Sequence, residues 1–191
     1  EAIGAGRARV VVAGGTESMS NAPYLLRGAR WGYRMGHGEI VDSLLAEGLT
    51  CAVNACHMGI TAEEVASAYG VSRTAQDAFA LRSQERAAGA IADGFFRDEI
   101  FAVEIAQKKG PATTFETDEY PRAGSTLERL AALKPAFAPG GTVTAGNASG
   151  INDGAGAVVL TSERRAAAAG LTPLARIIGY AHAGVEPGLM G

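Results

Sequence analysis

Short apolar runs stand near both ends of the chain, and they predict β-strands. Residues 10–13 read VVVA, a continuous run typical of a strand buried on both faces. Residues 155–160 and 174–181 have the same character and predict two more strands. Residues 99–105 alternate enough for a further strand, and residues 143–145 are expected to be extended. A buried strand needs sheet neighbours and covering helices, so these runs indicate an α/β fold.

Two capping patterns predict helices in the middle of the chain. In the sequence TAEE, Thr61 and Glu64 match a capping box, which predicts a helix over residues 62–69. A second capping box begins at Ser125, in STLE, and it opens a helix that Pro135 ends.

Three further helices follow from other local signals. Ser72 is a good N-cap for a helix that closes near Gly94. Residues 39–48 predict a short helix, and residues 162–169 predict an Ala-rich helix with Gly170 just past its end.

Strands near both ends and helices between them indicate a sheet domain interrupted by an insertion. We expect residues 1–17 and 147–191 to belong to the sheet core, and residues 18–146 to form the inserted domain. The sequence before the first strand resembles the last turns of a helix, and the final residues, GVEPGLMG, contain no closing element. The chain is therefore expected to be an internal segment of a longer protein.

Composition narrows the function classes. Of 191 residues, 47% are hydrophobic and 19% are charged, so the chain can bury a core and does not read as disordered. A net charge of -3 argues against nucleic acid as the main partner. No apolar run approaches the roughly 20 residues of a membrane span. With only two cysteines, a disulfide framework is not expected, and a reducing cytoplasmic location is predicted.

Motifs that carry chemistry by themselves are missing from the sequence. It has no Gly-x-Ser-x-Gly elbow, no phosphate-binding Walker loop and no dinucleotide fingerprint. Cys51 and Cys56 lack partners at zinc spacing, so no metal site is expected. His57 precedes a predicted helix, where it either contacts a ligand or bonds to backbone. Cys56 is either a nucleophile or an inert core thiol.

Several blocks of sequence together resemble the thiolases, the acetyl-CoA acetyltransferase family. The blocks, in order, are VVAGGTESMSNAPY, HMGITAEEVA, SRTAQDAFALRSQ, LKPAF, GTVTAGNASGINDGAGAVVL and LARIIGYAHAGVEPGLMG. They cover essentially the whole chain, and the HMG form resembles the biosynthetic, acetoacetyl-CoA type more than the long-chain degradative type. The resemblance implies the layered αβαβα thiolase fold, of which this chain is part of the N-terminal half with its inserted loop domain.

The resemblance also implies an activity. Thiolases join two acyl-CoA molecules, or split a 3-ketoacyl-CoA with free CoA, and use the CoA thioester as substrate without a further cofactor. A cysteine takes the acyl group, a second cysteine moves a proton, and a histidine assists. None of these catalytic positions matches a residue of this chain, so the chain alone is expected to be inactive. A non-catalytic acyl-CoA-binding fragment or a degenerate relative stays open.

What the chain matches is the CoA-binding side of the family. The resemblance assigns His57 and Met58 to the acyl pocket, Ser149 to the pantetheine arm, and Arg122 to the nucleotide end. The resemblance also assigns Leu49 and Phe137 to apolar contacts with pantetheine and adenine. It assigns Ala145, Gly146 and Gly150 to the slot that holds the pantetheine arm. A wall of small residues lets the thin pantetheine arm lie against backbone, although the same glycines also suit a tight turn. Arg129 departs from the small residue common there, and it either contacts phosphate or faces solvent.

Residues 21–42 resemble the loop that pairs with its own copy in tetrameric members. Tyr24, Trp31 and Tyr33 are the aromatic residues expected at such a contact, since aromatic side chains favour interface cores. They would equally suit packing within one subunit. The resemblance therefore implies a homo-oligomer, a dimer or a tetramer.

Overall fold

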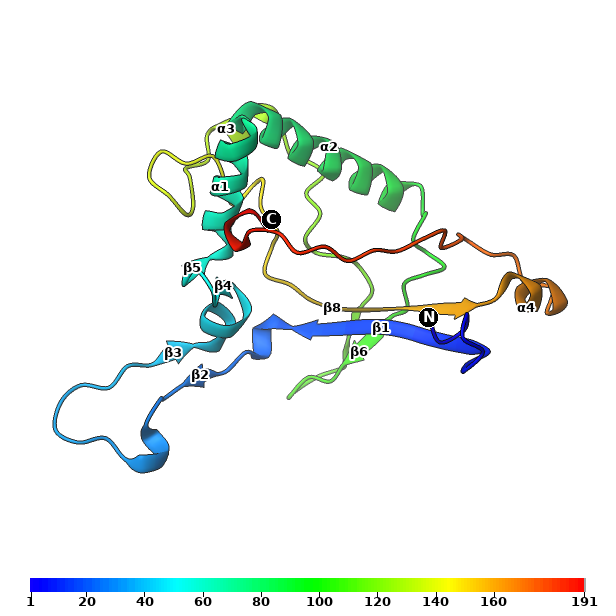
Figure 1. Cartoon of the computed structure of the whole chain (residues 1–191), viewed down its shortest axis with the longest axis horizontal. Helices are drawn as coiled ribbons and strands as arrows, with labels where there is room; N and C mark the ends of the chain where they lie inside the picture. Colours follow the sequence, from blue (N-terminus) through cyan, green and yellow to red (C-terminus); the bar gives the residue numbers. More distant parts are fainter. Residues whose placement is uncertain (191) are drawn as a thin grey trace. The chain divides into compact units, whose positions relative to one another are not determined.

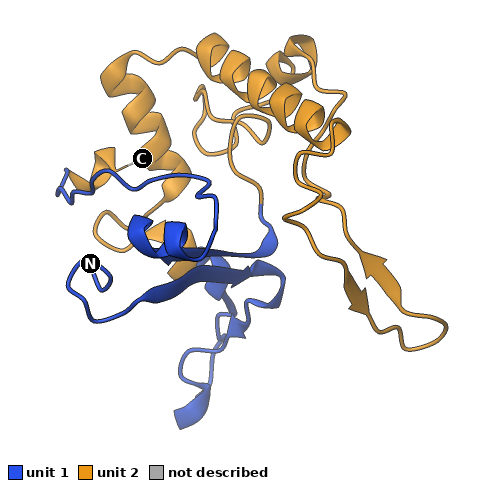
Figure 2. Cartoon of the chain, turned by 90° about the vertical axis from the view of Figure 1, so that its right-hand side faces the viewer, with its two compact units in different colours: residues 1–46, 151–185 blue, residues 47–150, 186–191 orange. Residues whose placement is uncertain are grey.

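The structure is a computed structural model that describes residues 1–190. It divides into two compact units, shown in different colours in Figure 2. Unit 1 holds residues 1–46 and 151–185, and unit 2 holds residues 47–150 with the last residues from 186 on. These boundaries differ from the predicted ones, and an inserted domain over residues 18–146 stays a prediction.

Unit 1 is built on one long strand pair. Strand β1 (Val10–Ser18) runs antiparallel to β8 (Asp153–Thr161), so two segments far apart in the sequence lie side by side (Figure 1). Both strands were predicted, and both are longer than the apolar runs that predicted them. A Cβ on Gly14 would lie 2.7 Å from the carbonyl oxygen of Gly156, so glycine is what lets the strands approach there.

The predicted burial of these strands on both faces is wrong for this chain. Val12 is 69% exposed and Val159 is 71% exposed. Within residues 1–190 this sheet has two strands, β1 and β8, and a pair of strands leaves apolar side chains open to solvent.

After β8, the helix predicted from the sequence is formed, whereas the predicted strand is not. Helix α4 (Glu163–Ala168) begins after Ser162, whose side chain accepts the N–H of Arg165, and Gly170 has a φ of 67° past its end. The strand predicted over residues 174–181 is not formed. Ile178 is 94% exposed. No described strand pairs with this segment, and an apolar run becomes a strand only when its backbone groups find partners.

The loop between β1 and unit 2 carries a second small ladder. Strands β2 (Tyr24–Leu25) and β3 (Val41–Asp42) pair antiparallel, with short 3₁₀ turns η1 (Met19–Asn21) and η2 (Ala29–Trp31) before and within the loop. The helix predicted over residues 39–48 is wrong in its first part, where residues 41–42 belong to strand β3. Its second part is helical and forms the short π-helix η3 (Leu44–Gly48).

Unit 2 starts with a hairpin that leads into a helix. The strands β4 (Thr50–Cys51) and β5 (Cys56–His57) pair antiparallel, and α1 (Met58–Tyr69) follows directly. The predicted N-cap at Thr61 is wrong, since His57 caps the helix. Thr61 is 1% exposed and donates from Oγ1 to the carbonyl of Met58 at 2.6 Å, so its hydroxyl already has a partner inside the first turn.

The other helices of unit 2 lie close to their predicted places. Helix α2 (Arg73–Ala92) has the predicted N-cap, Ser72. Helix α3 (Leu127–Ala131) is capped by Thr126, one residue after the predicted Ser125. The hydroxyl of Thr126 accepts the N–H of Arg129 at 3.3 Å.

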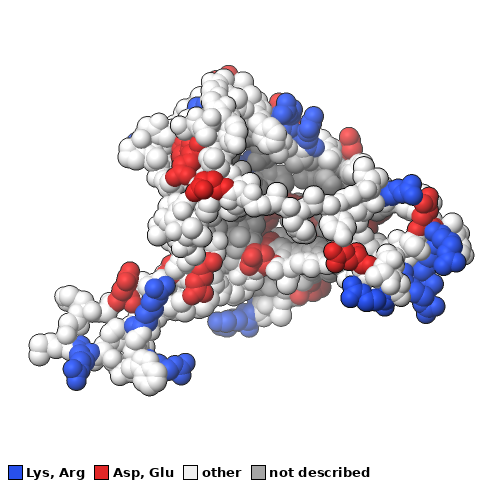
Figure 3. Space-filling view, in the orientation of Figure 1, with Lys and Arg blue, Asp and Glu red and all other residues white. Residues whose placement is uncertain are grey.

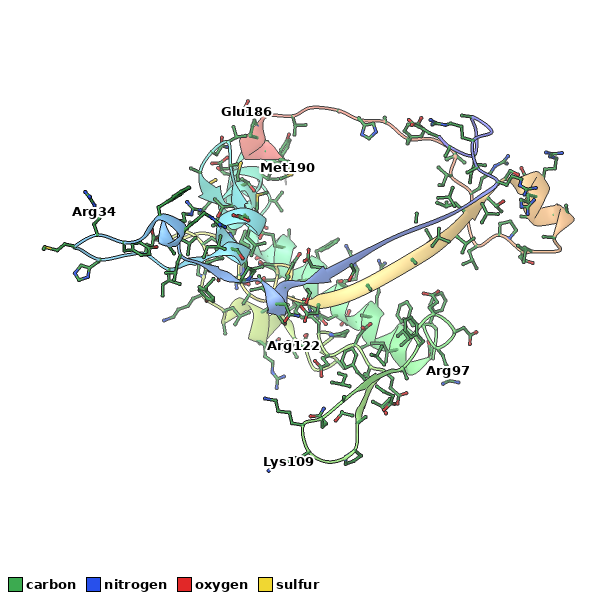
Figure 4. The ribbon with its side chains drawn as sticks, turned by 90° about the horizontal axis from the view of Figure 1, so that it is seen from below. Arg34, Arg97, Lys109, Arg122, Glu186 and Met190 are labelled. Atoms are coloured by element: carbon green, nitrogen blue, oxygen red, sulfur yellow. The ribbon has the colours of Figure 1, made fainter. Side chains whose placement is uncertain are left out.

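Two minor elements complete unit 2. Strands β6 (Val103–Ile105) and β7 (Thr113–Phe115) form a hairpin, with Lys109 in the loop at its tip (Figure 4). The strand predicted over residues 99–105 thus forms only in its last part. The 3₁₀ turn η4 (Pro187–Leu189) packs on α1.

Charge is spread over the visible face, with one basic concentration in unit 1. Lys and Arg side chains gather over α4, which carries Arg164 and Arg165 (Figure 3). Nearby, Arg176 pairs with Glu163 at 2.9 Å. Among residues 1–190, no helix combines the length and apolar character needed to cross a membrane.

Candidate functional site

The junction of β5 and α1 positions His57. Its backbone is still extended, and its Nδ1 accepts the N–H of Gly59 at 2.9 Å, which caps the helix. The imidazole stacks on the ring of Phe137, with centroids 4.6 Å apart and planes 24° from parallel. A Cβ on Gly59 would overlap that ring, so glycine permits the close approach. Of the two roles left open for His57, the backbone contact is present.

Met58 lies at the same junction, together with Leu49 and Phe137, the two apolar contacts expected for pantetheine and adenine. The N–H of Met58 donates to the carbonyl of Leu49 at 2.8 Å, which joins the two ends of the hairpin. Phe137 lies in a segment, residues 134–140, that lines an open hollow of about 420 Å³. The structure therefore brings together Leu49, His57, Met58 and Phe137, four of the residues singled out from sequence.

The predicted small-residue wall consists of Ala145, Gly146, Ser149 and Gly150. Glu63 of α1 holds the segment that leads into this wall. Both carboxylate oxygens of Glu63 accept the N–H of Thr142, at 2.9 and 2.8 Å, and one also accepts the Thr142 hydroxyl at 2.8 Å. The N–H of Val143 donates to Oε1 of Glu63 at 2.8 Å. Burial alone would raise the pKa of Glu63, but these bonds from Val143 and Thr142 outweigh it and lower that pKa below its ordinary value.

The wall is held in its middle by Asn147. Its Oδ1 accepts the N–H of Thr144 at 2.7 Å, and its amide donates to Oδ1 of Asp77 at 2.9 Å and to the carbonyl of Thr142 at 3.1 Å. Asp77 is 4% exposed and also pairs with Arg73 at 2.7 Å. Arg73 in turn donates to the carbonyl of Leu130 at 2.6 Å. A buried carboxylate is thus fully partnered, as burial of a charge requires.

The wall residues differ in how they are held. A Cβ on Gly146 would lie 2.6 Å from side-chain carbons of both Leu130 and Leu133, so this glycine allows close backing by apolar side chains. Ala145 and Ser149 are exposed, and Gly150 is half-buried.

The wall also lies beside the segment that carries Phe137. Thr144 pairs with Pro135 as an isolated bridge, and the N–H of Ala136 donates to the carbonyl of Val143 at 2.9 Å. The two groups of predicted residues therefore belong to one continuous, hydrogen-bonded region of unit 2.

Arg122 lies in the loop that leads into α3 (Figure 4). Its backbone N–H donates to Oε1 of Gln84 at 2.7 Å, and its side chain is exposed. In the same loop, the hydroxyl of Tyr120 donates to the carbonyl of Ala148 at 3.2 Å, which joins the loop to the wall. Arg129 donates to the carbonyl of Gly124 at 2.9 Å, a third role beside the two considered for it.

Sequence reasoning missed the polar residues behind the wall: Glu63, Arg73, Asp77 and Asn147. Each carries an ordinary helical or turn signal in the sequence, and nothing there shows which backbone groups it reaches.

The two cysteines of the chain have free thiols. Cys51 and Cys56 are both half-buried. Within residues 1–190, no group of three or more His, Cys, Asp or Glu side chains is placed to hold a metal ion.

Comparison with known families gives a match to the thiolase N-terminal domain over residues 1–164. The chain belongs to the thiolase family. It is 57% identical to the acetyl-CoA acetyltransferase of Pseudomonas aeruginosa over 191 residues, which is 100% of this chain and 49% of that protein. This thiolase chain therefore spans about half the length of the curated relatives it matches.

Solved thiolases share the fold. The crystal structure of the Bacillus anthracis acetyl-CoA acetyltransferase matches with a TM-score of 0.90 at 48% identity, over 99% of this chain and 48% of that one. Human mitochondrial 3-ketoacyl-CoA thiolase in complex with CoA matches with a TM-score of 0.86 at 43% identity, over 99% of this chain and 47% of that one. The predicted family and the α/β thiolase fold are both confirmed.

Proposed function

We propose that this thiolase chain is part of an acetyl-CoA C-acetyltransferase. The reaction condenses two acetyl-CoA molecules to acetoacetyl-CoA, or runs in reverse as thiolysis of a 3-ketoacyl-CoA. One observation carries the proposal, the similarity along the whole chain to acetyl-CoA acetyltransferases. The CoA thioester is the substrate, and no further cofactor takes part.

In this proposal the chain supplies a wall for the pantetheine arm of CoA. Ser149 is exposed, so its hydroxyl is free to orient an amide of the arm. Ala145, Gly146 and Gly150 present little side-chain volume, and the bonds of Glu63 and Asn147 fix the segment from behind. A fixed wall binds better than a mobile one because less conformational freedom is lost when the ligand binds.

The acyl group would lie near the junction of β5 and α1. Met58 offers an adaptable apolar surface for a short acyl chain, and the His57–Phe137 stack makes a flat neighbour. Leu49 is held to Met58 by a backbone bond, and Leu49 and Phe137 would add apolar contacts to pantetheine and adenine. The exposed guanidinium of Arg122 would pair with phosphate oxygens at the nucleotide end.

The reacting groups of this chemistry are assigned to residues outside these 191. The acyl-accepting cysteine, the proton-moving cysteine and the assisting histidine match no residue here. The chain's own part is to bind and orient the thioester. We also propose that the protein works in the cytoplasm as a homo-oligomer, with residues 21–42 at a contact between copies.

Acetoacetyl-CoA thiolysis by the intact protein tests the activity. We expect acetoacetyl-CoA to be consumed when free CoA is added. Ser149→Ala and Arg122→Ala should each raise the KM for CoA by about tenfold, the value of one lost hydrogen bond or ion contact, with little change in kcat. Ser83→Ala and Arg86→Ala, exposed on α2, are the matched controls and should leave KM unchanged.

Calorimetric titration with CoA separates the alternatives. If the intact protein binds CoA and does not consume acetoacetyl-CoA, it is a non-catalytic acyl-CoA-binding module. If Ser149→Ala and Arg122→Ala both bind CoA as tightly as the parent, the assigned wall is wrong even where the activity is present.

A further inference from the structure

The two cysteines of this chain face each other across a strand pair. In the β4–β5 hairpin, Cys51 is directly opposite Cys56, and the neighbouring pair is Thr50 with His57. Both thiols are free and half-buried, and they are the only cysteines among the 191 residues. No role in the proposed reaction has been assigned to either.

The spacing of such a pair matches that of a disulfide. Directly opposite residues of an antiparallel ladder lie with Cα atoms roughly 4.5–5.5 Å apart, and their side chains leave the same face. Disulfides bridge Cα atoms roughly 4.4–6.8 Å apart. The register of the hairpin therefore places the two cysteines within the range that a disulfide spans.

Two other uses of the thiols fit less well. A metal site would need further ligands, and within the described part of the chain no third His, Cys, Asp or Glu completes one. A catalytic thiol would need a base. His57 follows Cys56 in the same strand, so its side chain leaves the opposite face. Its Nδ1 already accepts the N–H of Gly59, and its ring stacks on Phe137.

We propose that Cys51 and Cys56 form a reversible intramolecular disulfide, made by exchange with an oxidised low-molecular-weight thiol such as glutathione disulfide. One protein thiolate attacks a glutathione sulfur, the glutathione S–S bond breaks, and one glutathione thiolate leaves. The second protein thiolate attacks the mixed disulfide and expels the other glutathione. The protein thiols lose two electrons, glutathione disulfide gains them, and the two thiol protons pass to the glutathiones.

The oxidised hairpin would keep its register and lose its freedom to open. Four residues, 52–55, separate the cysteines, and Ala55 already holds a left-handed φ of 51°. The hairpin leads directly into α1 through His57 and Met58. The disulfide therefore acts on the start of the helix that carries the candidate site, and it forms whether or not the proposed acyl transfer is right.

Peptide mapping of the intact protein tests the bond. The protein is equilibrated in glutathione buffers of rising oxidised fraction, quenched with acid, alkylated with N-ethylmaleimide and digested with trypsin. Residues 35–73 fall in one tryptic peptide that contains both cysteines. In reducing buffer we expect this peptide to carry two alkyl groups, and in oxidising buffer none. The oxidised peptide should be lighter than the unalkylated, reduced peptide by two hydrogen atoms, and reduction should restore both alkylation sites.

A matched variant moves one thiol to the other face of the hairpin. The double substitution Thr50→Cys with Cys51→Thr keeps the composition and places the thiol out of register with Cys56. It should form at least about tenfold less internal disulfide at the same glutathione ratio. In Cys51→Ser, the remaining Cys56 should carry one glutathione instead.

Three results would overturn the proposal. They are two freely alkylated cysteines in the most oxidising buffer, glutathione on both cysteines of the parent protein, and a disulfide from Cys56 to a cysteine outside this peptide. Circular dichroism of the reduced variants checks that each is folded. Equal internal oxidation of the parent and the out-of-register variant would also refute the role of the register.

Discussion

The amide of Asn147 donates to the carboxylate of Asp77 at 2.9 Å, and this bond joins the candidate CoA wall to helix α2. The same side chain accepts the N–H of Thr144 at 2.7 Å. Thr144 is fully buried and Asp77 is 4% exposed, so neither partner has water as a replacement. The wall's conformation thus depends on polar groups behind it rather than on the small residues that face outward.

Asn147→Ala should therefore lower the free energy of unfolding by about 2 kcal/mol or more, because it leaves the N–H of Thr144 and an oxygen of Asp77 without partners. Urea unfolding of the intact protein measures this. Ser149→Ala is the control in the same segment, where the side chain is exposed, and should change stability by no more than about 0.5 kcal/mol. Equal midpoints for the two variants would show that the Asn147 bonds add nothing.

Local signals in the sequence predicted the elements whose stability is local. Helix α2 begins after Ser72, as its N-cap pattern required, because the cap bond closes within three residues. The Thr61 capping box failed because His57 caps the helix earlier and Thr61 is used inside it. The strand over residues 174–181 failed because strand formation depends on a partner elsewhere, which an apolar run does not reveal.

The candidate site shows the same division. The resemblance to a family named Leu49, His57, Met58 and Phe137, and the structure brings these four together. It did not name the contacts that fix the wall, since Glu63 and Thr142 are separated by 79 positions in the chain. Bonds over such separations are set by how helices and loops meet, and no periodicity or spacing in the sequence records them.

Gly146→Ala tests how tightly the wall is backed. The added Cβ would lie 2.6 Å from carbons of Leu130 and Leu133, and Leu130 is buried, so the segment must shift. We expect a loss of about 1–3 kcal/mol in stability together with weaker CoA binding. Denaturant unfolding and calorimetric titration measure the two effects.

Gly89→Ala on α2 is the matched control for that variant. Its Cβ would meet nothing within 4 Å, so the helix should gain about 0.5–1 kcal/mol with no change in CoA affinity. If Gly146→Ala is as stable and binds CoA as tightly as Gly89→Ala, then Leu130 and Leu133 can move aside without loss of stability.

Trp31→Ala tests the proposed contact between copies. Trp31 is 88% exposed, so it is not packed on its own subunit, and its removal should leave folding unchanged. If residues 21–42 form the contact, the sedimentation coefficient should fall to that of a smaller assembly. Phe101→Ala, at a side chain 81% exposed in unit 2, is the control and should keep the parent's assembly. An unchanged assembly for Trp31→Ala would remove this residue from the interface.

The pKa of Glu63 predicts how the wall responds to acid. Burial alone would raise this pKa, but the N–H groups of Val143 and Thr142 and the Thr142 hydroxyl donate to the carboxylate and lower it below 4.5. Because the folded pKa lies below the unfolded one, the unfolded chain takes up the proton first. The stability contributed by Glu63 is therefore complete above the unfolded pKa and is lost as pH falls through the folded pKa.

Glu63→Gln should remove that part of the pH dependence. At pH near 7 the variant should be less stable by about 1–2 kcal/mol, since an amide accepts fewer of the three donors. As pH falls from above the unfolded pKa through the folded pKa of Glu63, the gap between parent and variant should close, because protonation weakens only the parent. Urea midpoints measured across this range give the gap directly, and Glu85→Gln, exposed on α2, should track the parent throughout. A gap that stays constant from neutral to acid pH would mean that the Glu63 carboxylate does not hold the wall through its charge.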